Sequence, residues 1–326
     1  MILISGVEKR YSTDQISDPT KAKLHRTANI LKCKRPSMKR SRSFRNWLSL
    51  STAFVVLLSS CGGVTEHNET TTDTTIQPDK AVELPTLQLK DPDPANVLPA
   101  LFPKGTYDAT DQTIIWMPEG EAAKNMFPKD GQGNSTMVLQ TLSVTGNTRK
   151  KVMVLNTYTL DKNGDRLTCH ACAPMMGLAV FSREADGSWI LTAWNPAMGE
   201  YGANGKPYDR TLIQIGNEKY ALQVSGGFSA QGQSLANAWF YGLDNAQLIW
   251  EVQTLQSNEF IIDGRILLEK LNTTISFLPS DAAYFDAKTT TKGHRIDQVG
   301  KTRIPVNETM LYRYDASKGT YLEMNN

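Results

Sequence analysis

From about residue 136 to the end of the chain, apolar and polar residues alternate in short runs that are rich in β-branched and aromatic side chains. Turn-forming residues separate these runs, which cover residues 136–144, 150–160, 220–226, 248–255 and 273–278. Alternation with a period of two is typical of strands that have one buried face. No helical pattern of useful length interrupts the runs, so parallel βαβ units are not expected. The pattern predicts a mainly β, antiparallel domain over residues 136–326.

One sequence unit occurs three times in this domain. An aromatic strand, a polar turn and a second apolar strand follow one another in "VFSREADGSWIL" from Val180, "WFYGLDNAQLIW" from Trp239 and "LYRYDASKGTYLEM" from Leu311. The central residues of these turns tolerate the positive φ angles of tight hairpins. A further apolar strand lies upstream of each unit, at 152–158, 220–225 and 274–278. We therefore expect a meander of repeated β-hairpins.

Meandering sheets of this kind resemble the blades of a small propeller and are similar to the integrin-type blade repeats. The resemblance implies a propeller-like assembly. Those repeats carry an Asp-x-Asp-x-Asp-Gly calcium loop, which this chain lacks. A β-sandwich or an open barrel is therefore the alternative arrangement of the hairpins.

Residues 81–135 have a different character. Prolines stand at positions 85, 92, 94, 99 and 103. We expect a loop-rich lead-in with a few short strands, one of them at 113–117, and a short helix at 119–127.

An apolar run from Trp47 to Leu58 follows the basic stretch "MKRSRSFRN". The run is too short to cross a bilayer, which takes roughly 20 apolar residues, but it has the length of the apolar part of a secretory signal. It ends on Leu58-Ser59-Ser60-Cys61, which resembles the lipobox of bacterial lipoproteins. The resemblance implies cleavage before Cys61, with diacylglycerol on its thiol and an acyl chain such as palmitate on the new amine.

The resemblance also implies how the first part of the chain is organised. Residues 38–60 are expected to be the signal peptide, with Met38 as the true start and residues 1–37 as a disordered extension of the gene model. Residues 61–80 are rich in Thr and acidic residues, a composition that favours a flexible tether. Gly62 stands where inner-membrane lipoproteins of the enteric type carry Asp. We therefore expect anchoring in the outer membrane, on its periplasmic face or at the cell surface.

Removal of the signal changes the charge of the protein. The full chain has 35 Lys or Arg and 33 Asp or Glu, and residues 1–60 hold 12 of the former and 3 of the latter. Residues 61–326 thus carry a net charge of about −7, and an acidic surface argues against nucleic acid as a partner.

Two cysteines remain beyond the anchor, in "TCHACAP". An oxidising envelope compartment favours a disulfide between Cys169 and Cys172, which would hold a local bend. Thiol–disulfide chemistry is one alternative, but it needs a Cys at the start of a helix. Zinc binding by Cys169, His170 and Cys172 is the other, and it needs the three side chains to converge on a tight loop. We expect the disulfide, no bound metal and no cofactor.

The sequence carries no catalytic motif that we recognise. A Ser-His-Asp device would have to use His170 or His294 as its base, because His67 lies in the tether. Paired carboxylates on different strands leave no trace in sequence spacing, so a carboxylate-dependent hydrolase stays an alternative. We assign no catalytic residue.

Aromatic residues indicate where a ligand would bind. The segment 193–209 contains Gly, Pro and aromatic residues, and long loops on a rigid sheet commonly carry binding sites. His170, Trp194, Tyr201 and Tyr208 are the candidate binding residues. We expect a binding or scaffolding module of the cell envelope, with an envelope protein or a glycan as ligand. The alternative is an envelope enzyme that is thiol-based at Cys169 and Cys172 or uses carboxylates.

The lipobox makes a prediction about mass. Protein extracted from membranes with detergent is expected to begin at Cys61 and to carry three acyl chains, with two further thiols that alkylate only after reduction. Intact mass spectrometry with and without reductant measures both. A chain that begins near Met1 without lipid would contradict the anchor, and two free thiols would contradict the disulfide.

Overall fold

A computed structural model describes residues 84–119, 133–146, 149–169, 172–297, 299 and 301–324. All of them belong to the unit Thr74–Asn326. The expected signal peptide, Cys61, the tether, most of the expected helix at 119–127 and His170 lie outside the described residues.

The first sheet has seven antiparallel strands in the order β1-β7-β6-β5-β4-β3-β2. Their bounds are β1 Gln88–Leu89, β2 Thr106–Asp108, β3 Thr113–Trp116, β4 Asn134–Val144, β5 Lys150–Thr159, β6 Met175–Arg183 and β7 Trp189–Glu200. The helix α1, Pro94–Leu101, packs against one face of this sheet. Asp93 caps its N-terminus by accepting a hydrogen bond from the Asn96 N–H at 2.9 Å, and Pro94 follows where a missing N–H costs nothing.

The second sheet has eight strands that follow one another in chain order, each antiparallel to the next. Their bounds are β10 Asp209–Gly216, β11 Lys219–Ala230, β12 Gln233–Gly242, β13 Leu248–Ile262, β14 Arg265–Leu278, β15 Asp286–Asp297, β16 Thr302–Asp315 and β17 Thr320–Glu323. A two-stranded hairpin of β8, Gly202–Ala203, and β9, Lys206–Pro207, connects the two sheets along the chain.

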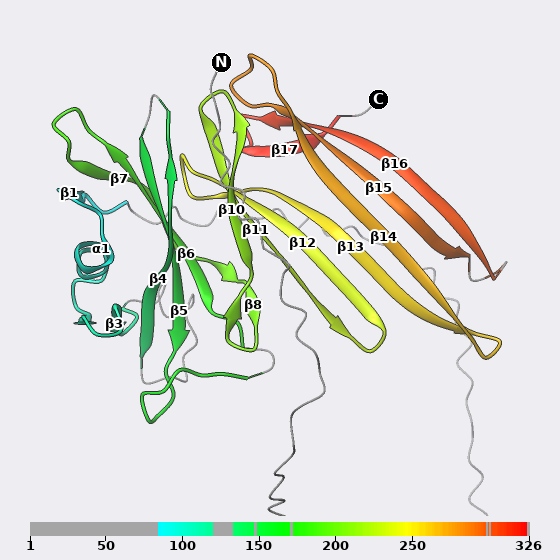
Figure 1. Ribbon diagram of the computed structural model, residues 1–326, viewed down its shortest axis with the longest axis horizontal. Coiled ribbons are helices and arrows are strands. Elements are labelled where there is room, and N and C mark those ends of the chain that lie inside the picture. The colour runs from blue at the N-terminus through cyan, green and yellow to red at the C-terminus, as the bar shows by residue number, and fades with distance from the viewer. Residues whose placement is uncertain are drawn as a thin grey trace, which may run out of the picture. The chain divides into compact units, whose positions relative to one another are not determined.

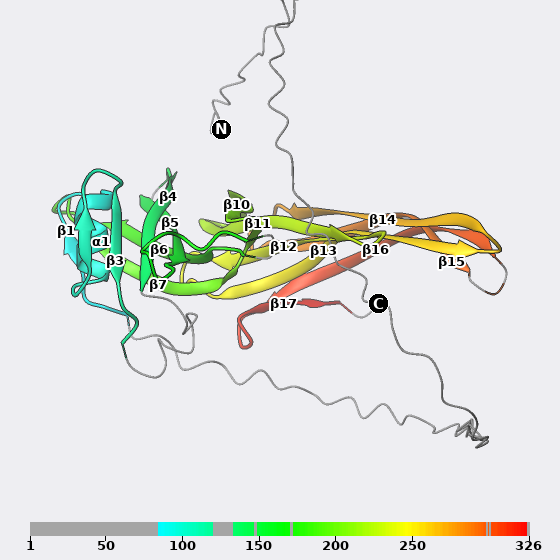
Figure 2. The ribbon, with the colours of Figure 1, turned by 90° about the horizontal axis from the view of Figure 1, so that it is seen from below.

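Strand alternation divides the apolar residues of the first sheet between its two faces. Met153 and Leu155 of β5 lie in a core cluster with Val97 and Leu98 of α1. Their neighbours in β5 lie in a second cluster that also contains residues of β11, β12 and the turn after β12. The first sheet is therefore buried on both faces, by α1 on one side and by the second sheet on the other (Figure 1, Figure 2).

The second cluster is the shared core of the two sheets. Val152, Val154, Val180 and Ala193 of the first sheet pack with residues of β11, β12 and the turn after β12, which are Leu222, Val224, Tyr241, Leu243 and Ala246. A third cluster, around Phe240, Trp250 and Tyr321, lies within the second sheet. There β17 also contacts β13, because the sheet curls toward its first strands.

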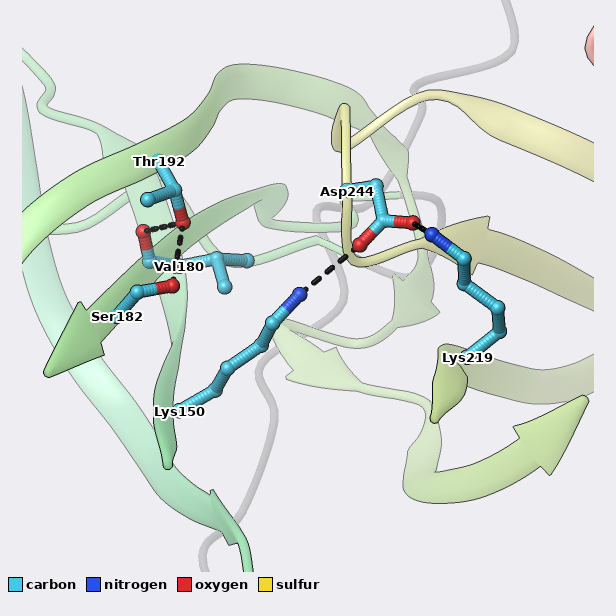
Figure 3. A network of polar contacts seen from close by, with 6 residues as sticks. All are labelled: Lys150, Val180, Ser182, Thr192, Lys219 and Asp244. Carbon is cyan, nitrogen blue, oxygen red and sulfur yellow. Dashed lines mark hydrogen bonds and ion pairs between the residues drawn. The ribbon is translucent and has the colours of Figure 1, made fainter. Parts of the chain in front are cut away.

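A polar network lies beside the shared core, at the turn between β12 and β13 (Figure 3). Asp244 accepts from Lys150 of β5 at 2.9 Å and from Lys219 of β11 at 2.6 Å. Burial raises the pKa of the Asp244 carboxyl, but the hydrogen bonds and charges of the two lysines outweigh it, so the net pKa lies below its ordinary value. Asp244 thus connects the two sheets electrostatically. In β7, Thr192 donates to the Val180 carbonyl at 3.2 Å, which ties β7 to β6.

The prediction of a mainly β, antiparallel fold is confirmed. The three hairpins of the repeated sequence unit are β6–β7, β12–β13 and β16–β17. The strands are not divided into four-stranded blades, because β10–β17 form one continuous sheet, so the propeller-like arrangement does not apply. In the third unit, β15 lies between the upstream strand β14 and the hairpin.

Substitution of Asp244 by Asn tests the connection between the sheets. We expect a loss of about 1 kcal/mol in the free energy of unfolding at neutral pH, because both ion pairs lose a charge and the carboxyl is partly screened by solvent. The folded-state pKa is lowered, so the difference from wild type is fully present above the unfolded carboxyl pKa of about 4 and is lost as the pH falls through the folded pKa.

Urea unfolding at several pH values measures this difference. Glu119→Gln is the matched control, since its pair with Lys104 is well exposed and should contribute almost nothing. Equal stability of wild type and Asp244→Asn at pH 7 would contradict the role of Asp244.

Candidate functional site

The candidate binding residues of the sequence do not form one site. Trp194 lies on the α1 side of the first sheet, where its ring meets Phe102 edge-on at 6.1 Å. Tyr201 is buried in the shared core on the opposite face, and Tyr208 lies beside the second sheet. Of the three described candidates, Tyr208 is the one that lines a groove on the second sheet.

The prediction of a loop at 193–209 is wrong for most of that segment. Strand β7 continues to Glu200, and β8, β9 and the start of β10 take up most of the remainder. Strand β7 contains a bulge around Pro196. Leu178 of β6 pairs with Asn195, whereas Met176, two residues earlier, pairs with Gly199. Prolines are tolerated at such bulges, where the ladder of hydrogen bonds is interrupted.

Cys169 and Cys172 form a disulfide, as the sequence predicts. The Gly205 N–H donates to the Cys172 carbonyl at 2.8 Å, so the disulfide lies against the β8–β9 hairpin. The disulfide lies in the chain that enters β6, next to the segment that leads to Tyr208. It also removes both thiolates from metal ligation, and among the described residues no three His, Cys, Asp or Glu side chains are placed to hold a metal ion.

Tyr208 lies flat on a strand backbone that has no side chain at that point. A Cβ at Gly226 of β11 would overlap the Tyr208 ring, and the Tyr208 hydroxyl donates to the Gly227 carbonyl at 3.0 Å. The ring is also parallel to that of Trp239, with centroids 6.2 Å apart and planes 8° from parallel. Gly226 therefore permits a close approach of the aromatic ring, and β11 and β12 pair there without a bulge.

Trp239 connects this surface to the shared core. Its other neighbour is the buried Tyr201, whose ring centroid is 4.7 Å away. Tyr201 is hydrogen-bonded to the hydroxyl of Tyr241, which in turn donates to the Met198 carbonyl at 2.8 Å. Burial raises the pKa of both phenols, so both stay protonated at neutral pH and hold the aromatic stack in place.

A groove of about 570 Å³ opens beside the Tyr208–Trp239 pair. Phe228 and Leu235 add apolar surface to its lining, which also includes the polar side chains of Asn237, Glu251 and Gln253. The Asn237 amide donates to the Glu251 carboxylate at 2.7 Å, which leaves further lone pairs of that carboxylate for a ligand. We call this groove, lined by Tyr208, Trp239, Phe228, Asn237, Glu251 and Gln253, the aromatic groove.

The aromatic groove combines flat apolar surfaces with hydrogen-bonding groups along one side. Binding sites for small molecules commonly have this composition, in which apolar contacts supply area and a few polar groups orient the ligand. Tyr and Trp suit such sites because each offers an apolar face together with a polar atom.

A second apolar pocket, of about 270 Å³, lies between α1 and β3. Phe102 and Trp116 stack there with centroids 4.7 Å apart, and Trp194 and Pro196 complete the wall. The Trp116 indole N–H donates to the Thr136 hydroxyl at 2.8 Å. Because this pocket offers few polar groups to orient a ligand, the aromatic groove is the better candidate site.

No motif in the sequence identified Asn237, Glu251, Gln253 or Phe228 as candidate binding residues. Part of the signal was present, because alternation along β12 places Asn237 and Trp239 on one face of the strand. Their approach to Tyr208 depends on the pairing of β11 with β12, which no local pattern records. His294, the described histidine that the sequence offered as a base, is hydrogen-bonded to the Leu268 carbonyl on the neighbouring strand.

Comparisons with protein-family models, with curated proteins and with solved structures found no match for this chain. Within the described ranges, no helix has the length and apolar character to cross a membrane.

The close approach of Tyr208 to Gly226 makes a prediction about stability. Gly226→Ala should lower the free energy of unfolding by about 1–3 kcal/mol, because its Cβ has to displace the Tyr208 ring. In the background of Tyr208→Ala the same substitution should cost much less, and a double-mutant cycle from urea unfolding measures the difference. Equal costs in both backgrounds would show that the ring does not depend on the glycine.

Proposed function

We propose that this protein is a lipid-anchored binding module of the bacterial cell envelope and that it holds a glycan chain in the aromatic groove. Cys61 carries the lipid and residues 61–80 act as the tether that lets the β domain stand clear of the outer membrane. The single observation that supports binding most directly is the aromatic groove itself, with Tyr208 and Trp239 in parallel beside Asn237 and Glu251.

A sugar ring matches the chemistry of this groove. One face of the ring carries C–H groups that pack on an aromatic plane, and its edge carries hydroxyls that donate and accept hydrogen bonds. Tyr208 offers the plane, while the Glu251 carboxylate and the Gln253 amide offer partners for the hydroxyls. Hydrogen bonds to a carboxylate are stronger than those between neutral groups, so Glu251 is expected to contribute to both affinity and orientation.

The frame behind the groove is suited to binding without large rearrangement. Tyr208 is held by its ring contact with Gly226, by its hydroxyl bond to Gly227 and by Trp239. Trp239 in turn rests on Tyr201 of the shared core. A surface that is already ordered loses little conformational entropy when a ligand binds, which favours affinity.

Two glycans of the envelope test the proposal, and they distinguish a protein on the periplasmic face of the outer membrane from one at the cell surface. Purified peptidoglycan sacculi probe the periplasmic side, and the oligosaccharide of lipopolysaccharide probes the cell surface. We expect the detergent-purified protein to bind one of them, with Tyr208→Ala and Glu251→Gln each weakening binding roughly tenfold, which corresponds to about 1.4 kcal/mol. Co-sedimentation serves for sacculi and calorimetry for the soluble oligosaccharide.

Two controls separate binding from folding. Tyr208→Phe keeps the aromatic plane and loses only the bond to Gly227, so it should retain most of the affinity. Ser229→Ala removes an exposed hydroxyl from β11 that bonds to Ser234 rather than lining the groove. Absence of binding to both glycans, or binding that Tyr208→Ala leaves unchanged, would contradict the proposal.

A further inference from the structure

The three most exposed large apolar side chains of the described residues gather at one end of the second sheet. Val299, Ile261 and Ile266 have relative exposures of 93%, 77% and 66%. Ile261 and Ile266 belong to the hairpin β13–β14, and Val299 lies between β15 and β16. Figure 1 and Figure 2 both place the turns of these two hairpins at the same end of the sheet.

The two isoleucines project from a rigid hairpin end. Ile261 pairs directly with Ile266 in the β13–β14 ladder, and one further pair of residues separates them from the turn. Asp263 and Gly264 form that turn with φ angles of 50° and 72°, the positive values of the tight two-residue type I′ turn. Lys301 bonds to Asp263 at 2.6 Å, so the β15–β16 loop is fastened to the end of the β13–β14 hairpin. We call this end, with Ile261, Ile266, Val299, Arg265 and Arg303, the hairpin tip.

Positive charge accompanies the apolar side chains. Arg265 is next to Ile266 and Arg303 is next to the half-exposed Ile304, and both arginines are exposed. Neither arginine forms a salt bridge with another described residue, whereas Lys301 is paired with Asp263 and Arg295 with Glu308. The hairpin tip therefore presents apolar side chains beside two cations whose charge is not balanced by an ion pair in the described part of the chain.

We propose that the hairpin tip inserts into the surface of a lipid bilayer that contains anionic lipids. Aliphatic side chains at the end of a turn reach the acyl boundary, and flanking arginines meet phosphates at the level of the headgroups. The inference rests on the described β domain alone and holds whether or not Cys61 is acylated or the aromatic groove binds a glycan.

The composition of the hairpin tip fits a bilayer better than a protein partner. Stable protein interfaces bury about 800 Å² on each side and are enriched in aromatic anchors around a packed centre. Here the exposed side chains are aliphatic: Ile261 and Ile266 form one pair on the strands beside a turn, and Val299 lies apart from them between β15 and β16. A fluid acyl layer accepts such a small and divided apolar surface, whereas a protein partner would need a matching pocket for each part.

A fluorophore at the hairpin tip tests the proposal independently of the lipid anchor and of the signal segment. The full chain would carry Cys33→Ser, Cys61→Ser and Ile261→Cys, with an environment-sensitive dye on the new thiol and the Cys169–Cys172 disulfide left intact. On addition of phosphatidylcholine vesicles that contain phosphatidylglycerol, we expect the dye emission to shift to the blue and to rise roughly threefold. The rise should fall with salt, which screens the arginines.

Matched variants test whether the dye response arises at the hairpin tip and depends on its arginines. The same dye at Met117→Cys, a position of comparable exposure at 60% directly after β3, should not respond even when the chain is bound to vesicles. Arg265→Ser combined with Arg303→Ser should weaken the response at Ile261 about tenfold and abolish its preference for phosphatidylglycerol. Since both arginines are exposed and outside ion pairs, this variant should fold normally, which circular dichroism checks.

Two results would overturn the proposal. One is a dye at Ile261 that stays in water while the chain sediments with the vesicles. The other is a dye that responds only to vesicles carrying envelope proteins, which would assign the hairpin tip to a protein partner.

Discussion

The apolar face that the two sheets share is the constraint on which the rest of this structure depends. Strands β5, β6 and β7 supply one side of it, and β11 and β12 supply the other. Side chains alternate along each strand, so these strands present a second set of residues on the opposite face. In the first sheet that set is also apolar, and α1 covers it. The position of one sheet on the other therefore determines which residues are buried in both.

The position of the aromatic groove at the surface depends on that packing. Tyr201 belongs to the shared core, Trp239 rests on Tyr201, and Tyr208 is parallel to Trp239 at the surface. Asp244 and its two lysines hold the sheets together at the β12–β13 turn, at the end of the same strand that carries Trp239. A change that shifts the sheets would thus move the walls of the groove, even if it touched no residue that lines it.

Much of the fold could be predicted from local patterns in the sequence. The strands at 113–116 and 150–159 lie where the sequence predicts them, the run at 248–255 forms the first half of β13, and the three repeated units form hairpins. The prediction of a loop at 193–209 is wrong, because glycine and proline at a bulge look the same in sequence as glycine and proline in a turn.

What the sequence by itself determined is the mainly β, antiparallel character of this protein and the hairpins within it, because both follow from short-range alternation and turn residues. The lipobox is equally local and stays a prediction. Only the tertiary structure decided that the strands form two sheets, that Trp194 and Tyr201 lie on opposite faces of one of them, and that Tyr208 meets Trp239 and Glu251. These relations join residues far apart in the chain, and they depend on strand pairing and sheet packing, which leave no periodic signal in the sequence.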